Sequence, residues 1–242
     1  MSREIKYKAI ILKKQPLGEG DEIITFYSKE QGKIRGLAKS VKSAKSKLQQ
    51  SLQALFLVDL ELAGRGGLPK IIGAQPVKVF MNLRENLEAL KTAFVAAELI
   101  LKFAPDEEKN ERLFEMLEIF LEFLNSAPTN EQMNLGLAKF KLAILTVSGF
   151  SIIAPKTVSE SAGLFFSAEN GGFVSGFSGR PVKPSVLQLY LNLKQISLKN
   201  LPEVSFQPLD LAELQHMLSE FIEYQLERHL KSEKYLNAKD VV

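Results

Sequence analysis

Lysine and arginine side chains gather in one segment of the chain, residues 32–50, which contains no acidic residue. Small residues separate several of these cations, a composition typical of loops. Cations on such a loop can follow a phosphate backbone and release its counterions, and serine hydroxyls can add hydrogen bonds to phosphate. The alternative interpretation is a solvated charged loop that binds no ligand. The cations of this segment are Lys33, Arg35, Lys39, Lys42, Lys45 and Lys47.

The net charge, +3 over 242 residues, is unevenly distributed along the chain. Residues 1–80 hold 15 Lys and Arg against 7 Asp and Glu, a net charge of +8, so the remainder carries −5. A basic module joined to a mildly acidic one indicates a polyanionic ligand for the first. Arg65 and Lys70 are weaker candidates for the same contacts.

The residue types needed for catalysis or metal binding do not come together in the sequence. The chain has no cysteine, which excludes disulfides and thiolate metal sites. Its two histidines, His216 and His229, lie about 220° apart around one expected helix, so they cannot share a metal from it. The run 64–67, Gly-Arg-Gly-Gly, lacks the Gly-Lys-Ser/Thr of a phosphate loop and reads as a hairpin turn. No nucleophile, base and orienting group can be assembled, and we expect no enzyme, no metal and no cofactor.

The first 80 residues alternate between polar and apolar side chains in short runs with β-branched residues, separated by glycine- and proline-containing turns. This pattern predicts five strands, and five short strands in about 80 residues suit a small closed barrel of the OB type. Tyr7, Phe26, Tyr27 and Phe56 could stack on bases, but strand aromatics are more often core, and we expect at most one to do so. The expected strands are 5–14, 23–27, 33–38, 55–62 and 70–79.

From residue 80 the apolar residues change to helical spacing. Thr129 and Gln132 have the spacing of a capping box at a helix start. Glycine and proline interrupt the pattern in residues 150–184, which predicts a small irregular insert. The fold class is therefore α+β, a barrel followed by a helical domain. The expected helices are 80–103, 107–124, 129–147, 185–196 and 209–230.

Apolar runs are short, and none approaches the ~18 residues that a membrane helix needs. The charged residues among the first 14 leave no apolar stretch for a signal peptide. We therefore expect a cytoplasmic protein without membrane contact.

The order of these features resembles the RecO family of bacterial DNA repair proteins, which are recombination mediators, over nearly the whole chain. No single motif is very specific, and the resemblance rests on their order and spacing together. The matching residues are Ala9-Ile10-Ile11-Leu12, Gly18-Glu19 with Asp21, Gly32-Lys33, Ala38-Lys39, Leu52-Gln53, Glu98-Leu99, Leu113-Phe114 with Leu117, and the run from Phe140 to Gly149-Phe150.

The resemblance implies an OB-fold DNA-binding domain over 1–80, a helical domain over 81–242, and a small zinc-ribbon-like insert at 151–183. Many members carry four zinc-binding cysteines there, but tetrahedral zinc needs thiolate or imidazole donors, so this insert should be degenerate and empty. Apolar side chains would hold it together instead, namely Leu164, Phe165, Phe166, Phe173 and Phe177. The positions that correspond to the cysteines are Ser159, Ala162, Ser175 and Ser178.

The resemblance also implies partners and a role. It implies that the protein binds single- and double-stranded DNA and anneals complementary strands. It also implies that the protein works with RecR to help load RecA onto DNA coated by single-strand binding protein (SSB). The acidic tail of SSB would meet the helical part, where Lys183, Lys194 or Lys199 could face it. A protein-interaction adaptor whose barrel binds an acidic protein is the main alternative, and a nuclease is a third.

Overall fold

The computed structural model describes residues 4–41, 46–64, 67–155, 163–175 and 179–237. The chain divides into two compact units, 1–125 and 126–242, which are described separately. Among the helices that the structure describes, none is long and apolar enough to cross a membrane.

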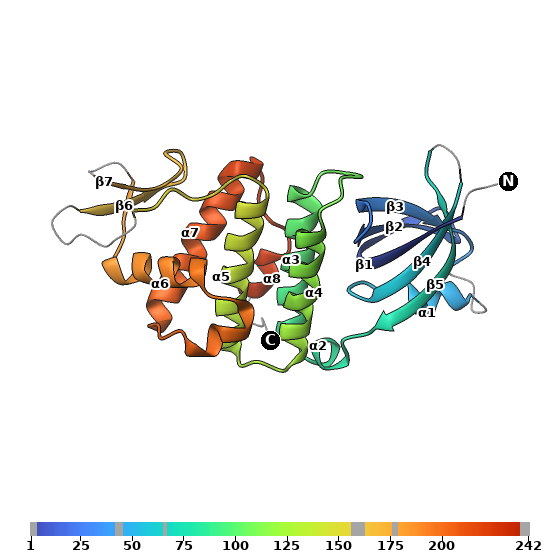
Figure 1. The fold of residues 1–242 in the computed structure, drawn as a ribbon, viewed down its shortest axis with the longest axis horizontal. Helices are drawn as coiled ribbons and strands as arrows, with labels where there is room; N and C mark the ends of the chain where they lie inside the picture. The colour runs from blue at the N-terminus through green and yellow to red at the C-terminus, as the bar shows by residue number, and fades with distance from the viewer. Residues whose placement is uncertain (1–3, 42–45, 65–66, 156–162, 176–178, 238–242) are drawn as a thin grey trace. The chain divides into compact units, whose positions relative to one another are not determined.

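A five-stranded closed barrel forms the first part of unit 1, and it confirms the predicted fold class (Figure 1). The strands follow the order β1-β2-β3-β5-β4 around the barrel, and β3 and β5 close it in parallel. Their bounds are β1 Glu4–Leu17, β2 Asp21–Ser28, β3 Gly32–Ala38, β4 Leu57–Ala63 and β5 Lys70–Lys78.

Alternation along the strands places one set of apolar side chains inside the barrel, including Ile24, Phe26, Ile34, Ala38 and Val58. In β1 the register shifts between Ile11 and Lys13, a β-bulge that changes which residues face outward in the rest of the strand. The inner side chains are buried and form one continuous core, which explains why this chain segment closes on itself.

Three helices complete unit 1: α2 Met81–Glu85, α3 Leu87–Phe103 and α4 Glu111–Asn125. Asn86 caps α3, because its side chain accepts the N–H groups of Glu88 and Ala89. The helices α3 and α4 lie side by side (Figure 1) and contact each other. A short helix, α1 Lys47–Ser51, lies between β3 and β4 in the chain, where the sequence predicted only a loop.

Unit 2 contains the remaining helices and a three-stranded sheet of order β7-β6-β8. Thr129 and Gln132 form the predicted capping box at the start of α5. A short 3-10 helix and a separate terminal helix α8 are features that the sequence pattern did not reveal. The elements are α5 Asn130–Val147, β6 Leu164–Ser167, β7 Gly172–Ser175, β8 Arg180–Pro181, α6 Pro184–Gln195, η1 Leu198–Glu203, α7 Pro208–Leu226 and α8 Glu233–Asn237.

Candidate nucleic-acid interface

The outward residues of β3 carry two of the predicted cations. Ile34 and Ala38 face the barrel core, so Arg35 and Leu37 alternate onto the outer surface. Lys39 follows in the turn directly after the strand. Arg35 and Lys39 are both exposed. One exposed cation therefore stands on the outer face of β3 and another at its end, where a nucleic-acid backbone could approach both.

The ladder places further cations beside them. Lys70 is opposite Leu37 in the parallel pairing of β3 and β5, and paired residues share a face of the sheet. Thr25 of β2 pairs with Arg35 on one side and with Lys13 of β1 on the other. We call these four exposed cations, which lie in β1, β3, β5 and the turn after β3, the outer strip: Lys13, Arg35, Lys39 and Lys70.

The positive charges of the outer strip are not neutralised by acidic side chains of the described residues. None of its four side chains has an ion-pair partner in the part of the chain that the structure describes. Sequence reasoning missed Lys13 because the bulge before it hides its direction. Strict alternation from Ala9 and Ile11 would have turned Lys13 toward the core, and no local signal in the sequence marks the bulge.

Lys33 differs from the other predicted cations although it shares the same face of β3. Its Nζ donates to the carbonyl oxygen of Leu101 at 3.0 Å and pairs with Asp106 at 3.2 Å, and only 13% of its side chain is exposed. The backbone continues the contact, because the N–H of Glu107 donates to the carbonyl of Lys33. Lys33 therefore joins the barrel to the loop between α3 and α4.

The remaining predicted cations cannot be placed. Lys42, Lys45 and Arg65, and the side chain of Lys47, lie outside the described residues. They stay predictions from the sequence.

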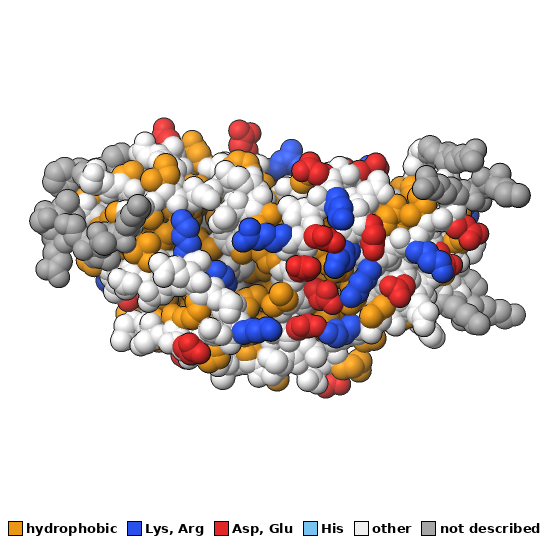
Figure 2. Space-filling model, viewed as in Figure 1, with side chains coloured by type: hydrophobic (Ala, Val, Ile, Leu, Met, Phe, Trp, Pro, Cys, Tyr) orange, Lys and Arg blue, Asp and Glu red, His pale blue; other side chains and the backbone are white. Residues whose placement is uncertain are grey.

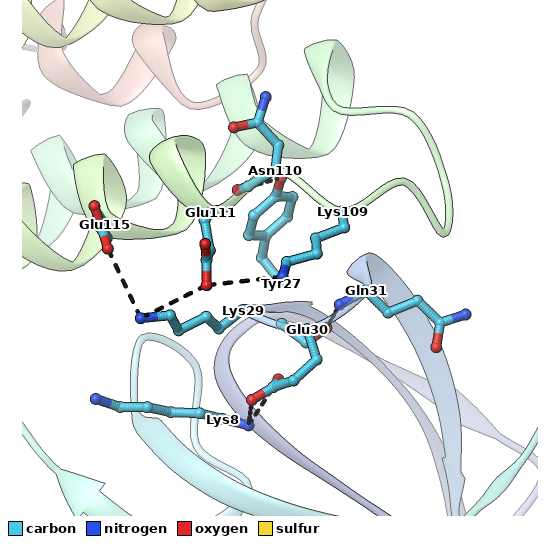
Figure 3. Close-up of polar contacts among 10 residues, drawn as sticks. Lys8, Tyr27, Lys29, Glu30, Gln31, Lys109, Asn110, Glu111 and Glu115 are labelled. Carbon is cyan, nitrogen blue, oxygen red and sulfur yellow. Dashed lines mark hydrogen bonds and ion pairs between the residues drawn. The ribbon is translucent and has the colours of Figure 1, made fainter.

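Acidic side chains of α4 meet a second set of barrel lysines. We call the residues Glu111, Glu115, Glu118 and Glu122, which recur every three or four positions along one face of α4, the α4 acidic stripe. Lys29 lies between Glu111 and Glu115, with Nζ–O distances of 3.9 and 3.7 Å (Figure 3). Lys8 pairs with Glu118 at 3.7 Å, and Lys78 pairs with Glu122.

Tyr27 sits beneath this contact, where its hydroxyl donates to the carbonyl of Asn110 at 3.4 Å (Figure 3). Burial, and secondarily the carboxylate of Glu108, raise the pKa of Tyr27 to about 12, so the phenol stays neutral. Tyr27, Tyr7, Phe26 and Phe56 are each at most 7% exposed. None of these four rings therefore presents an open face for base stacking in this structure.

Two family models cover the chain. The family described as Recombination protein O N terminal matches residues 1–80, and Recombination protein O C terminal matches residues 84–234. The chain belongs to the RecO family. Its relatives include the DNA repair protein RecO of Dehalococcoides mccartyi strain CBDB1, 29% identical over 97% of this chain and 96% of the relative.

The similarity to other RecO proteins is as extensive. The DNA repair protein RecO of Pelotomaculum thermopropionicum is 30% identical over 96% of this chain and 93% of the relative. That of Anaeromyxobacter sp. strain K is 24% identical over 96% of both chains. In this RecO-family protein the junction of the two family models, near residue 80, falls at the end of the barrel, whereas the compact units meet at residue 125.

The side chains of this chain do not provide zinc ligands for the zinc-ribbon-like insert that the resemblance implied at 151–183. Of the four corresponding positions, only Ser175 lies in the described part, at the end of β7, and Ser159, Ala162 and Ser178 lie outside it. Serine and alanine supply neither thiolate nor imidazole. Within the described residues, no group of three His, Cys, Asp or Glu side chains could hold a metal ion.

Aromatic packing, rather than a metal ion, stabilises the three-stranded sheet of β6, β7 and β8. Phe166 of β6 is buried and meets Phe173 edge-on with ring centroids 5.5 Å apart, and it also contacts Phe221 of α7. Phe173 in turn packs on Tyr190 of α6 at 5.1 Å. These contacts, each with offset or edge geometry, fasten the small sheet to α6 and α7, as the sequence predicted for Phe166 and Phe173.

Proposed function

We propose that this protein is a non-enzymatic recombination mediator in DNA repair that binds single- and double-stranded DNA through the outer strip of its barrel. Membership of the RecO family and the naming of its relatives as DNA repair proteins support the role in repair. The observation that carries the site is the outer strip itself: exposed cations of β1, of β3 and the turn after it, and of β5, without ion-pair partners among the described residues.

The geometry of the strip favours backbone contact without sequence readout. Its cations surround Leu37 and Thr25 on the outer surface of a sheet. Lysine and arginine on such a surface can neutralise successive phosphates, and the affinity then depends steeply on salt and hardly on sequence. Lys42, Lys45 and Lys47 stay predictions from the sequence for the same phosphate contacts, because Lys42, Lys45 and the side chain of Lys47 lie outside the described residues.

The triple variant Arg35→Ala, Lys39→Ala, Lys70→Ala should bind a labelled single-stranded oligonucleotide at least tenfold more weakly at low salt. Each lost phosphate contact removes ~0.7 from the slope of log affinity against log salt for single strands, so the slope should fall by about 2. Fluorescence anisotropy over a salt series measures both quantities.

The matched control for this variant is Lys102→Ala, Arg112→Ala, Lys234→Ala, which removes the same charges from exposed positions elsewhere. It should change the affinity less than threefold and leave the slope within experimental error. Equal effects of the two triple variants would show that net charge, rather than the outer strip, governs binding. A wild type that binds no oligonucleotide at low salt but binds an acidic protein would favour the adaptor function instead.

We further propose that the protein anneals complementary strands and works with RecR to help load RecA onto SSB-coated DNA. The acidic tail of SSB would bind the helical part, where Lys183, Lys194 and Lys199 are exposed at the two ends of α6 and in η1. Annealing of oligonucleotides coated with SSB should proceed faster with this protein than without it, and RecR should change that rate. Annealing that is blocked by SSB would contradict the proposed use of its tail.

A further inference from the structure

The side of the barrel that faces the helices of unit 1 is lined by lysines as well. One cross-strand row runs from Lys78 of β5 through Leu57, Ile10 and Tyr27 to Lys33 of β3. The apolar members of this row are buried, and the lysine at each end pairs with an acid of the helical segment, Glu122 and Asp106 respectively.

Two more lysines lie beside this row, toward the turn between β2 and β3. Lys8 and Lys29 are neighbours, because the N–H of Lys29 donates to the carbonyl of Lys8 at 2.9 Å. Acids are present as well: Asp59 stands opposite Lys8 in the ladder, and Glu30 accepts the Lys8 backbone N–H. We call Lys8, Lys29 and Lys78 the covered lysines.

The covered lysines are paired but not deeply buried. The side chains of Lys8, Lys29 and Lys78 are 39%, 39% and 43% exposed, and most of their distances to carboxylate oxygens exceed the length of a tight hydrogen bond. Figure 2 shows acidic and basic side chains interspersed over α4 and the adjacent edge of the barrel. Exposed ion pairs of this kind are weak, so the pairs neutralise charge more than they fix the structure.

We propose that the α4 acidic stripe is an internal competitor of nucleic acid, which neutralises the covered lysines and so confines DNA to the outer strip. The inference rests on the proposed DNA binding. The spacing of the stripe supports it: four carboxylates recur along one helix face from Glu111 to Glu122. Along that face they meet Lys29, which follows β2, then Lys8 of β1 and then Lys78 of β5. Without the stripe, the basic surface would continue around the barrel and a strand could bind in more than one path.

Neutralising the stripe should expose the second basic surface. The variant Glu111→Gln, Glu115→Gln, Glu118→Gln, Glu122→Gln should bind a labelled oligo(dT) about tenfold more tightly than wild type at low salt. Three additional phosphate contacts should steepen the salt slope by about 2. Fluorescence anisotropy over a salt series measures both, and circular dichroism shows whether the variant is folded.

A control variant with the same change in net charge separates local from global electrostatics. Glu85, Glu131, Glu169 and Glu203 are exposed and lie outside the stripe, and their replacement by Gln should raise the affinity no more than about threefold. Replacing the three covered lysines by Gln should leave wild-type affinity within twofold but abolish the gain in the neutralised background.

The outcomes distinguish the two proposals. If the stripe variant gains no more than its control, or if its gain survives loss of the covered lysines, the internal competition is refuted while binding to the outer strip stands. If wild type binds no oligonucleotide and the stripe variant binds none either, the proposed function fails and the inference fails with it. If only the stripe variant binds, the stripe does mask the covered lysines, but its confinement of DNA to the outer strip is refuted together with the proposed site.

Discussion

Replacing Glu233 by alanine should lower the free energy of unfolding of the full chain by about 3–5 kcal/mol, because it leaves a buried charge without its counter-ion. Lys141 of α5 is only 3% exposed, and its Nζ lies 2.6 Å from the carboxylate of Glu233 in α8. It also donates to Gln215 and Ser219 of α7, each at 2.9 Å. Urea denaturation followed by circular dichroism measures the loss.

Two further variants test the reason for that loss. In the double variant Lys141→Met, Glu233→Leu, apolar side chains replace the whole pair, and this change should recover stability to within about 1.5 kcal/mol of wild type. Glu88→Ala breaks the more exposed pair with Lys91 and should cost less than about 1 kcal/mol. A loss at Glu233 no larger than that at Glu88 would mean that α8 detaches readily and lets water reach Lys141.

The pH dependence of Glu233→Ala gives an independent check. Burial lowers the pKa of Lys141 in the folded protein, and the Glu233 carboxylate opposes this shift. Without that carboxylate the folded-state pKa falls further, whereas the unfolded lysine titrates near 10.5. At pH values between these two pKa values, the unfolded state binds more protons than the folded state, so the free energy of unfolding rises with pH. The deficit of the variant relative to wild type should therefore shrink as the pH is raised toward 10.5.

The barrel was predictable because its signal is local. Alternation of period two, interrupted by glycine-containing turns, marks each strand, and the capping box at Thr129 marks the start of α5. The ends were less certain, since β1 continues through Leu17, beyond the predicted end at residue 14. Helices of five residues such as α1 and α8 are too short to show a helical period, which is why the sequence pattern did not reveal them.

The candidate site was predictable only in part, because long-range contacts decide which cations remain available. Lys33 and Arg35 are both positively charged and point in the same direction from β3, yet only Lys33 is covered by the loop between α3 and α4. Nothing within the strand distinguishes them. The uneven net charge likewise overstated the available positive surface, since Lys8 and Lys29 are neutralised by helical acids of the same unit.

The close approach of that loop to the barrel also makes Gly32 hard to replace. Gly32 adopts a φ of +72°, and an added Cβ would overlap the carbonyl oxygen of Glu108 and lie 2.8 Å from its carbonyl carbon. Gly32→Ala should therefore lower the free energy of unfolding by about 3 kcal/mol, of which ~1–2 kcal/mol is the cost of a left-handed conformation and the rest the displacement of packed backbone. Urea denaturation of the full chain measures the loss.

Gly18 is the matched control, because it separates backbone conformation from steric overlap. It lies in the preceding turn, between β1 and β2, with a φ of +63° and no atom within 4 Å of an added Cβ. Gly18→Ala should cost only the conformational part, ~1–2 kcal/mol. The excess loss at Gly32 then measures how firmly the loop between α3 and α4 is held against the barrel. Equal losses at the two glycines would mean that the loop between α3 and α4 moves away from the barrel at little cost. The pairing of Lys33 with Asp106 would then contribute little to the stability of this contact.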